Sequence, residues 1–142
     1  MIDTAILWAA IARLADQAPL DQARVEEVLG LELLEIRRNA TTRFLEGDGL
    51  LLVEGPEISV DLRLRVDEGS TGWLLVLTLN EPCIRHTQVR EHYPDLIVAE
   101  TPRGRSPEEQ TVFSTPQAWG QLAFGFRVAS PDWLASVILQ PT

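Results

Sequence analysis

The chain has 142 residues, of which 45% are hydrophobic and 23% are charged, and this is the composition of one ordinary globular domain. The apolar fraction excludes a disordered chain, and no stretch approaches the roughly 18 uninterrupted apolar residues of a membrane span. The formal net charge of −9 would repel the phosphate backbone of a nucleic acid. We therefore expect this protein to bind neither membranes nor nucleic acids.

The negative charge is concentrated in the first part of the chain. Residues 1–81 carry 15 acidic residues and 7 arginines, whereas residues 82–142 carry 6 acidic residues and 5 arginines. All 12 basic residues are arginines, whose planar guanidinium groups suit defined pairs with carboxylates. If charge steers a partner toward the protein, it acts through the first part. The alternative is that the acidity only maintains solubility.

The cysteine content bears on the cellular compartment. Cys83 is the only cysteine, so no disulfide can form within the chain, whereas small secreted domains usually depend on disulfides. The first residues also lack the basic segment with which a secretory signal peptide begins. We therefore expect a cytoplasmic protein.

The chain opens with two predicted helices. Apolar residues recur at steps of three and four over residues 3–16, which predicts an amphipathic helix. Its other face is mostly alanine, so we expect neighbours on two sides of this helix, or a dimer contact through Trp8. A second helix is predicted over residues 20–29, where Gly30 would end it in the usual manner.

From residue 31 the hydrophobic period changes to two, which is typical of strands. Gly47-Asp48-Gly49 separates the runs 43–46 and 50–54. Glycine-rich triplets between extended runs are typical of tight turns. This segment therefore predicts a hairpin connection between two strands.

Two further strands complete the first part. Apolar and charged residues alternate over residues 60–66, which predicts an antiparallel strand with one solvated face. Residues 67–72 predict a second hairpin connection. The strand that follows, 73–79, is apolar on both faces apart from Thr78, so we expect it near the middle of the sheet with one side against the helices.

The second part begins with a third helix, predicted over residues 84–92 and ended by Pro94. The segment 102–109 is the longest polar break in the chain, and we expect it to be a mobile loop. The remaining strands are predicted over residues 96–101, 111–114, 121–128 and 133–140.

The sequence contains a weak internal repeat at a spacing of 64 residues. Residues 25–34 and 89–98 each combine a helix end, a breaker and an extended apolar run. The sequence thus predicts an α+β fold with a mainly antiparallel sheet in two weakly repeated helix-plus-meander halves, and with the helices packed on one face. We expect a single domain over residues 1–142, in which tandem halves 1–81 and 82–142 would share one sheet; the alternative is a chance similarity.

No residue pattern indicates catalysis or a bound metal. Cys83, His86 and His92 are the only soft or imidazole ligands, and the two histidines are six residues apart, so they would face different sides of a helix. The chain has no lysine for a phosphate-binding loop and no serine in a glycine-flanked elbow. We expect no catalytic residues, no metal site and no cofactor, and therefore not an enzyme.

The candidate contacts for a protein partner lie on turns and on the solvated strand face, where rigid scaffolds usually place recognition. Trp119, between a proline and a glycine, is expected to be half exposed. The alternatives are a solvated ladder of cross-strand charges and, for the aromatic residue, core packing. The candidates are Asp48, Glu54, Glu57, Asp67 and Glu68 on the connections, Asp61, Arg63 and Arg65 on the strand face, and Trp119.

The second part resembles the repeat unit of the β-lactamase-inhibitor-protein-like (BLIP-like) fold. The resemblance rests on the helix that stops at Pro94, on the runs 120–126 (GQLAFGF) and 133–139 (WLASVIL), and more faintly on residues 20–66. It implies helices stacked on a curved antiparallel sheet, often in tandem. It also implies binding rather than catalysis, because such modules act as protein inhibitors, interaction lipoproteins and immunity proteins of bacterial toxins. No binding residue of the family can be matched to a position here.

Two functions follow as expectations. The first is a non-catalytic protein-binding module, namely a cytoplasmic bacterial immunity or inhibitor protein that neutralises a cognate effector or toxin. The alternative is an acidic secretion-type chaperone that holds an effector segment as a homodimer. Trp8 distinguishes them, because the first helix should be packed in an inhibitor and should be a dimer or client surface in a chaperone.

Overall fold

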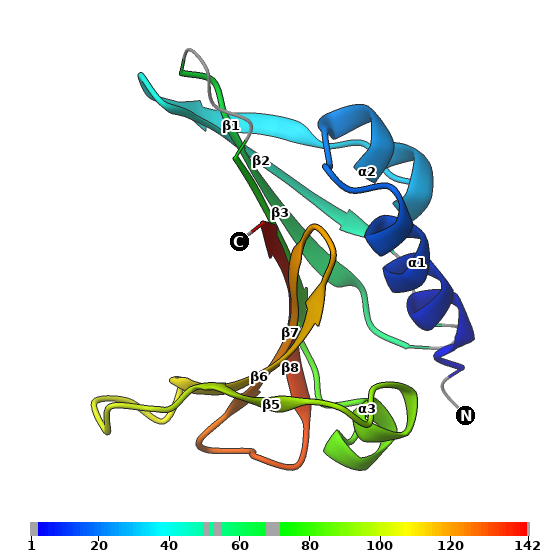
Figure 1. Ribbon diagram of the computed structural model, residues 1–142, viewed down its shortest axis with the longest axis vertical. Coiled ribbons are helices and arrows are strands. Elements are labelled where there is room, and N and C mark those ends of the chain that lie inside the picture. The colour runs from blue at the N-terminus through cyan, green and yellow to red at the C-terminus, as the bar shows by residue number, and fades with distance from the viewer. Residues whose placement is uncertain (1–2, 50–51, 53–54, 68–71, 142) are drawn as a thin grey trace.

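The computed structural model describes residues 3–49, 52, 55–67 and 72–141. These residues form three helices and one eight-stranded sheet (Figure 1). The helices are α1 (Ala5–Asp16), α2 (Gln22–Leu29) and α3 (His86–His92). The strands are β1 (Leu34–Arg38), β2 (Thr42–Gly49), β3 (Ile58–Arg65), β4 (Trp73–Leu79), β5 (Ile97–Glu100), β6 (Gln110–Gln117), β7 (Gly120–Arg127) and β8 (Leu134–Pro141).

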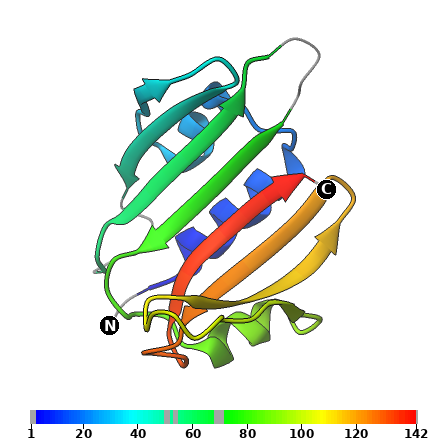
Figure 2. The same cartoon turned by 90° about the vertical axis from the view of Figure 1, so that its left-hand side faces the viewer.

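The strands are arranged in the order β1-β2-β3-β4-β8-β7-β6-β5, and every neighbouring pair is antiparallel. Each run of four strands is a meander, and β4 and β8 join the two meanders at the centre (Figure 2). All three helices lie on the same side of the sheet (Figure 1). The α+β fold with a mainly antiparallel sheet, predicted from the sequence, is confirmed.

The sheet is strongly curved, with the helices on its convex side (Figure 1). The hydrophobic core fills the space between these two layers, where Leu7, Ile11 and Leu14 of α1 are fully buried. Alternate residues of the strands face them, because successive side chains of a strand point to opposite faces. Leu45, Leu62, Leu75, Leu77, Phe124 and Phe126 are buried to within about 1% on this side.

The first helix is covered on two sides, as its sequence predicts. The Trp8 ring is only 8% exposed and stacks on the His92 ring of α3, with 4.2 Å between ring centroids. Its indole N–H donates to the Thr4 hydroxyl at 3.0 Å. Trp8 is therefore an internal contact that ties α1 to the second half of the molecule, and it is not exposed for a dimer contact.

The caps of α2 agree with the sequence pattern. The Asp21 carboxylate accepts the backbone N–H of Arg24 at 2.8 Å, which satisfies one of the unpaired donors at the start of the helix. Gly30 ends the helix in the left-handed conformation at φ 65°, which glycine adopts without a steric penalty.

The hairpin predicted at Gly47-Asp48-Gly49 is wrong, because β2 continues through all three residues. A Cβ on Gly47 would lie 2.9 Å from the Glu32 carbonyl oxygen. A Cβ on Gly49 would lie 2.6 Å from a Leu31 methyl carbon. The two glycines therefore let the 31–33 segment cross close to the strand, and they do not form a turn.

The turn between β1 and β2 is instead at residues 39–41, where the Asn39 side chain accepts the backbone N–H groups of Thr41 and Thr42. In the strand predicted over residues 50–54, Leu52 lies in a bend and is buried; the other four residues lie outside the described residues.

The predicted connection over residues 67–72 does link neighbouring antiparallel strands, β3 and β4. The Arg65 N–H donates to the Gly72 carbonyl at 2.9 Å, which closes the ladder on the strand side of the connection. Residues 68–71 lie outside the described residues. The strand that follows, β4, is the fourth of eight and lies at the centre of the sheet, as its apolar character predicts.

Candidate protein interaction site

The concave face of the sheet has no covering layer among the described residues (Figure 1). We call it the open face. One row of directly opposed cross-strand neighbours crosses it, with one residue from each strand. In sheet order, this central row is Leu34, Glu46, Asp61, Val76, Ile138, Ala123, Ser114 and Ile97.

The strands that contribute to the central row are arranged symmetrically about the β4–β8 pair. Val76 of β4 faces Ile138 of β8 at the centre, and 62 residues separate the two positions. The next pair outward, Asp61 and Ala123, has the same separation. The two meanders therefore meet about a local two-fold axis between Val76 and Ile138, although the side chains differ on its two sides.

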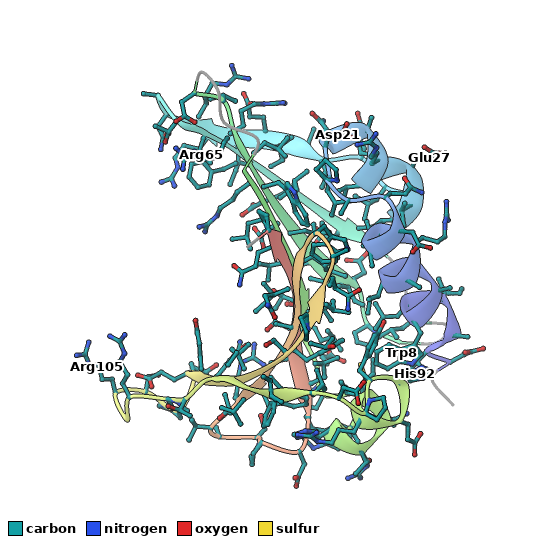
Figure 3. All side chains as sticks on the ribbon, viewed as in Figure 1. Trp8, Asp21, Glu27, Arg65, His92 and Arg105 are labelled. Carbon is teal, nitrogen blue, oxygen red and sulfur yellow. The ribbon has the colours of Figure 1, made fainter. Side chains whose placement is uncertain are left out.

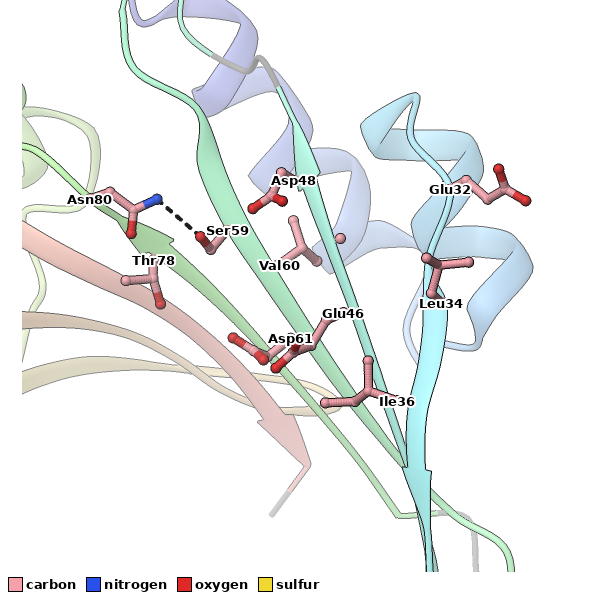
Figure 4. A pocket seen from close by; sticks show the side chains of 11 residues that line it. Glu32, Leu34, Ile36, Glu46, Asp48, Ser59, Val60, Asp61, Thr78 and Asn80 are labelled. Atoms are coloured by element: carbon pink, nitrogen blue, oxygen red, sulfur yellow. Dashed lines mark hydrogen bonds between the residues drawn. The ribbon is translucent and has the colours of Figure 1, made fainter.

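Carboxylates dominate the first half of the open face. The Glu46 and Asp61 side chains are opposed across β2 and β3, and the hydrogen bond between them raises the pKa of Glu46, with further contributions from burial and from the charges of Asp61 and Asp48. Beside them is a hollow of about 650 Å³ (Figure 4). Its charged lining consists of Glu32, Glu46, Asp48 and Asp61. We call it the acidic hollow.

The second half of the open face is mainly apolar, with Glu100, Gln121 and Gln140 among its polar lining residues. A hollow of about 510 Å³ extends from Leu74 and Val76 of β4 across to Ile97 of β5. Small residues of the central row, Ser114 and Ala123, stand where the first half has Glu46 and Asp61, so they leave room for it. Its remaining apolar lining is Ala99, Val112, Pro116 and Ile138. We call it the apolar hollow.

A polar contact lies across the open face at the end of the apolar hollow. The Ser136 hydroxyl of β8 donates to the Gln110 side-chain oxygen of β6 at 2.6 Å, across the intervening β7. Gly125 lies beneath this contact, and a Cβ there would be 1.9 Å from the same oxygen. The absence of a side chain at Gly125 therefore allows the contact.

Arginines occupy the open face at the other end of β2 and β3. The guanidinium groups of Arg37 and Arg63 lie 4.1 Å and 5.2 Å from the centroid of the Phe44 ring. Contacts of this kind between a cation and the face of an aromatic ring are attractive. They hold both cations against the sheet, where Arg37 and Arg63 line a hollow of about 350 Å³ together with Glu46 and Asp61.

The structure brings several of the predicted contacts onto one surface. Asp48 and Asp61 line the acidic hollow, and Arg63 and Arg65 line a smaller hollow at the end of β3. Asp48 reaches this face from within a strand, because the predicted hairpin is wrong.

The other predicted contacts lie elsewhere. The Asp67 carboxylate is engaged by both Arg65 donors, at 2.7 and 3.0 Å, and this bond lowers the pKa of Asp67. Glu57 is exposed just before β3, and Glu54 and Glu68 lie outside the described residues. Trp119 is half-buried in the β6–β7 turn and packs 5.4 Å from the Trp73 ring at the edge of the core, so it does not belong to the open face.

The histidines and the cysteine occupy separate places. His86 stacks on Phe126 at 4.1 Å, and burial, followed by the charge of Arg90, lowers its pKa. His92 stacks on Trp8. Cys83 is half-buried, and burial raises the pKa of its thiol. Among the described residues, no group of three or more such ligands is placed to hold a metal ion.

Sequence reasoning missed the apolar hollow and the Glu46–Asp61 pair. The signal for the first was present, because β4 is apolar on both faces while the helices cover only one. The pairing of Glu46 with Asp61 depends on the register between β2 and β3. The hairpin predicted at residues 47–49 would instead pair residues 43–46 with residues 50–54, so that prediction does not place Glu46 beside Asp61.

Within the part of the chain that the structure describes, no helix has the length and apolar character needed to cross a membrane. Comparison of the chain with protein-family models, with curated proteins and with solved structures finds no match.

Proposed function

We propose that the protein is a non-catalytic module that binds another protein on the open face of its sheet, as a cytoplasmic immunity or inhibitor protein of the BLIP-like type. The main support for the proposal is the exposed apolar surface of this face. The open face presents apolar side chains on several strands without a layer to cover them, and Leu34 and Ile97 at its two ends are 66% and 65% exposed. Contiguous apolar surface of this kind is typical of protein interaction sites.

The concave shape of the open face favours a partner with a convex surface over a partner with a flat one. Curvature presents the central row as the floor of a depression (Figure 1), into which a convex element of the partner could be inserted. Apolar side chains buried at the centre of an interface contribute most of the binding free energy, and a polar rim excludes water around them.

The charge distribution indicates the kind of partner. The acidic hollow has four carboxylates in its lining and no cation. A basic group of an effector would therefore be attracted to this hollow, which increases the association rate.

The packing of the first helix supports an inhibitor over a secretion-type chaperone. A chaperone of that class would use the helix as a dimer or client surface. Here Leu7, Ile11 and Leu14 are fully buried and Trp8 nearly so, so α1 offers little apolar surface to a client.

A photo-crosslinking amino acid tests the proposal in cells that make the protein. It is placed at Asp48 or at Ile97, which are exposed positions in the two halves of the open face. The same group at Glu27, on the exposed side of α2, is the control. We expect both open-face positions to crosslink the same protein and Glu27 to crosslink none. Crosslinks from Glu27 alone would place the interface on the helices.

Purified variants then test the partner directly. Asp48→Arg and Glu27→Arg make the same change of charge, the first in the acidic hollow (Figure 4) and the second on the exposed side of α2 (Figure 3). We expect Asp48→Arg to slow association with the crosslinked partner several-fold and to release the partner's activity, and Glu27→Arg to do neither. Equal effects of the two variants would contradict recognition at the open face.

A further inference from the structure

The loop at residues 101–109, between β5 and β6, projects on the same side as the open face, with Arg105 at its tip (Figure 3). One side chain organises its backbone. The Glu109 carboxylate accepts the N–H groups of Arg103 at 2.6 Å, Gly104 at 3.2 Å and Arg105 at 3.1 Å. Gly104 adopts φ 80° between the two arginines, which glycine allows without strain.

The base of the loop is also fixed. The Pro107 and Glu109 carbonyls accept the N–H groups of Ala129 and Val128, at 3.1 and 2.9 Å. The second carboxylate of the loop, on Glu108, forms an ion pair with Arg127 at 3.1 Å. Neither acidic side chain of the loop therefore pairs with the guanidinium groups of Arg103 and Arg105.

The loop arginines differ from the other arginines of the protein. Among the described residues, nine of the twelve guanidinium groups lie against a carboxylate or over an aromatic ring. Arg103 and Arg105 have neither kind of partner and are both exposed. The third such residue, Arg13, stands alone at the end of α1.

We propose that Arg103 and Arg105 form a preorganised site for carboxylates presented by an acidic segment of a protein partner. The guanidinium group donates two parallel hydrogen bonds to a carboxylate. The Glu109 bonds fix the backbone that carries both groups before binding, and this reduces the conformational entropy lost on association. The site is positively charged in a protein of net charge −9, so it attracts acidic groups that the net charge of the protein repels. It goes beyond the proposed function because it uses no residue of the open face.

A capped hexaglutamate peptide is the probe, added to isotope-labelled protein at low ionic strength and followed by NMR. We expect saturable shifts of the backbone amides of residues 103–105, although the net charges of protein and peptide repel each other. The double variant R103A/R105A should lose at least several-fold in affinity. The matched control R13A removes an equally unpartnered arginine and should bind the peptide as the unaltered protein does.

The variant Glu109→Gln distinguishes binding to a loop of fixed conformation from binding to positive charge alone. It removes a negative charge beside the arginines, so a purely electrostatic patch would bind the peptide more tightly. We expect it to bind several-fold more weakly, because the amide is a poorer acceptor for three backbone donors and the loop loses its fixed conformation. Retained or increased affinity would overturn the organised site. The absence of shifts in the loop, or equal losses in R13A, would overturn the arginine site itself. Neither result depends on whether a partner binds the open face.

Discussion

At the scale of single residues, the Glu46 and Asp61 pair brings two carboxyl groups together on the open face. The two carboxyl groups are directly opposed across β2 and β3, and like charges at such positions repel each other. Their hydrogen bond requires a proton, and it therefore raises the pKa of Glu46 above its ordinary value. The pair contributes its stability when Glu46 is protonated and loses it when Glu46 ionises.

Asp61→Asn tests this coupling. A raised pKa in the folded protein means that the contribution of the pair is fully present below the pKa of Glu46 in the unfolded chain, and is lost as the pH rises through its value in the folded protein. We expect the pKa of Glu46 to fall in the variant, and the variant to gain stability relative to the unaltered protein as the pH rises from about 4 to 7. Carboxyl NMR titration and urea denaturation at both pH values provide the measurements. A pKa of Glu46 that is unchanged in the variant would contradict the coupling.

At the scale of elements, strand β2 and its glycines explain how the first half is assembled. The strand has no side chain at Gly47 and Gly49, and there the chain that leads from α2 into β1 lies against it. The close contact allows Leu31 and Leu33 to join the edge of the core. β2 is thus both a partner of its neighbouring strands and a surface on which the preceding segment packs.

Gly47→Ala should destabilise the protein by about 1–3 kcal/mol, the usual cost of overpacking, because the new methyl group would press on the backbone carbonyl of Glu32. The neighbouring substitution Asp48→Ala is the matched control. It lies in the same strand with its side chain exposed on the open face, so its effect should stay within about 0.5 kcal/mol. Urea denaturation of the three proteins measures the difference. Equal stabilities would show that the 31–33 segment moves away without cost.

The elements differ in how well the sequence predicts them, and the reason is physical. All three helices lie within two residues of their predicted bounds, because the spacing of apolar residues and the breakers Gly30 and Pro94 are local signals. The glycines at 47 and 49 led to an incorrect turn prediction, because glycine is used both in tight turns and where two segments approach closely. Only the position of the other segment, residues 31–33, shows which use applies here.

The candidate site was harder to predict than the fold. The solvated residues of β3 were identified from alternation alone, since a strand with one buried face shows it directly. The apolar hollow is assembled from five strands of both halves. Its composition follows from the strand order, and local periodicity contains no information about which distant strands become neighbours.

At the scale of the whole molecule, contacts in several parts of the described structure join the two halves. β4 pairs with β8 at the centre of the sheet. On the helix side, Trp8 of the first half stacks on His92 of the second. At the edge of the core, Trp73 packs against Trp119. The halves therefore share one hydrophobic core, in which α1 serves both.

This sharing predicts that the halves unfold together. Urea denaturation followed by NMR should show the amide signals of β2 and those of β6 disappearing over the same range of denaturant, because neither meander keeps its core without the other. Two separate transitions would instead mean that each half is stable alone and that the contacts between the halves are weak.

The residues that determine the fold and the residues that would contact a partner are different residues of the same strands, and the central row belongs to the second group. Its side chains point away from the core, so they can be exchanged while the core residues that alternate with them stay constant. Descendants of such a chain would diverge at every second position of each strand and keep the same architecture. A combinatorial library randomised at Glu46, Asp61, Val76, Ile97, Ser114, Ala123 and Ile138 would use the same freedom, and the sheet would become a platform for selecting binders to new targets.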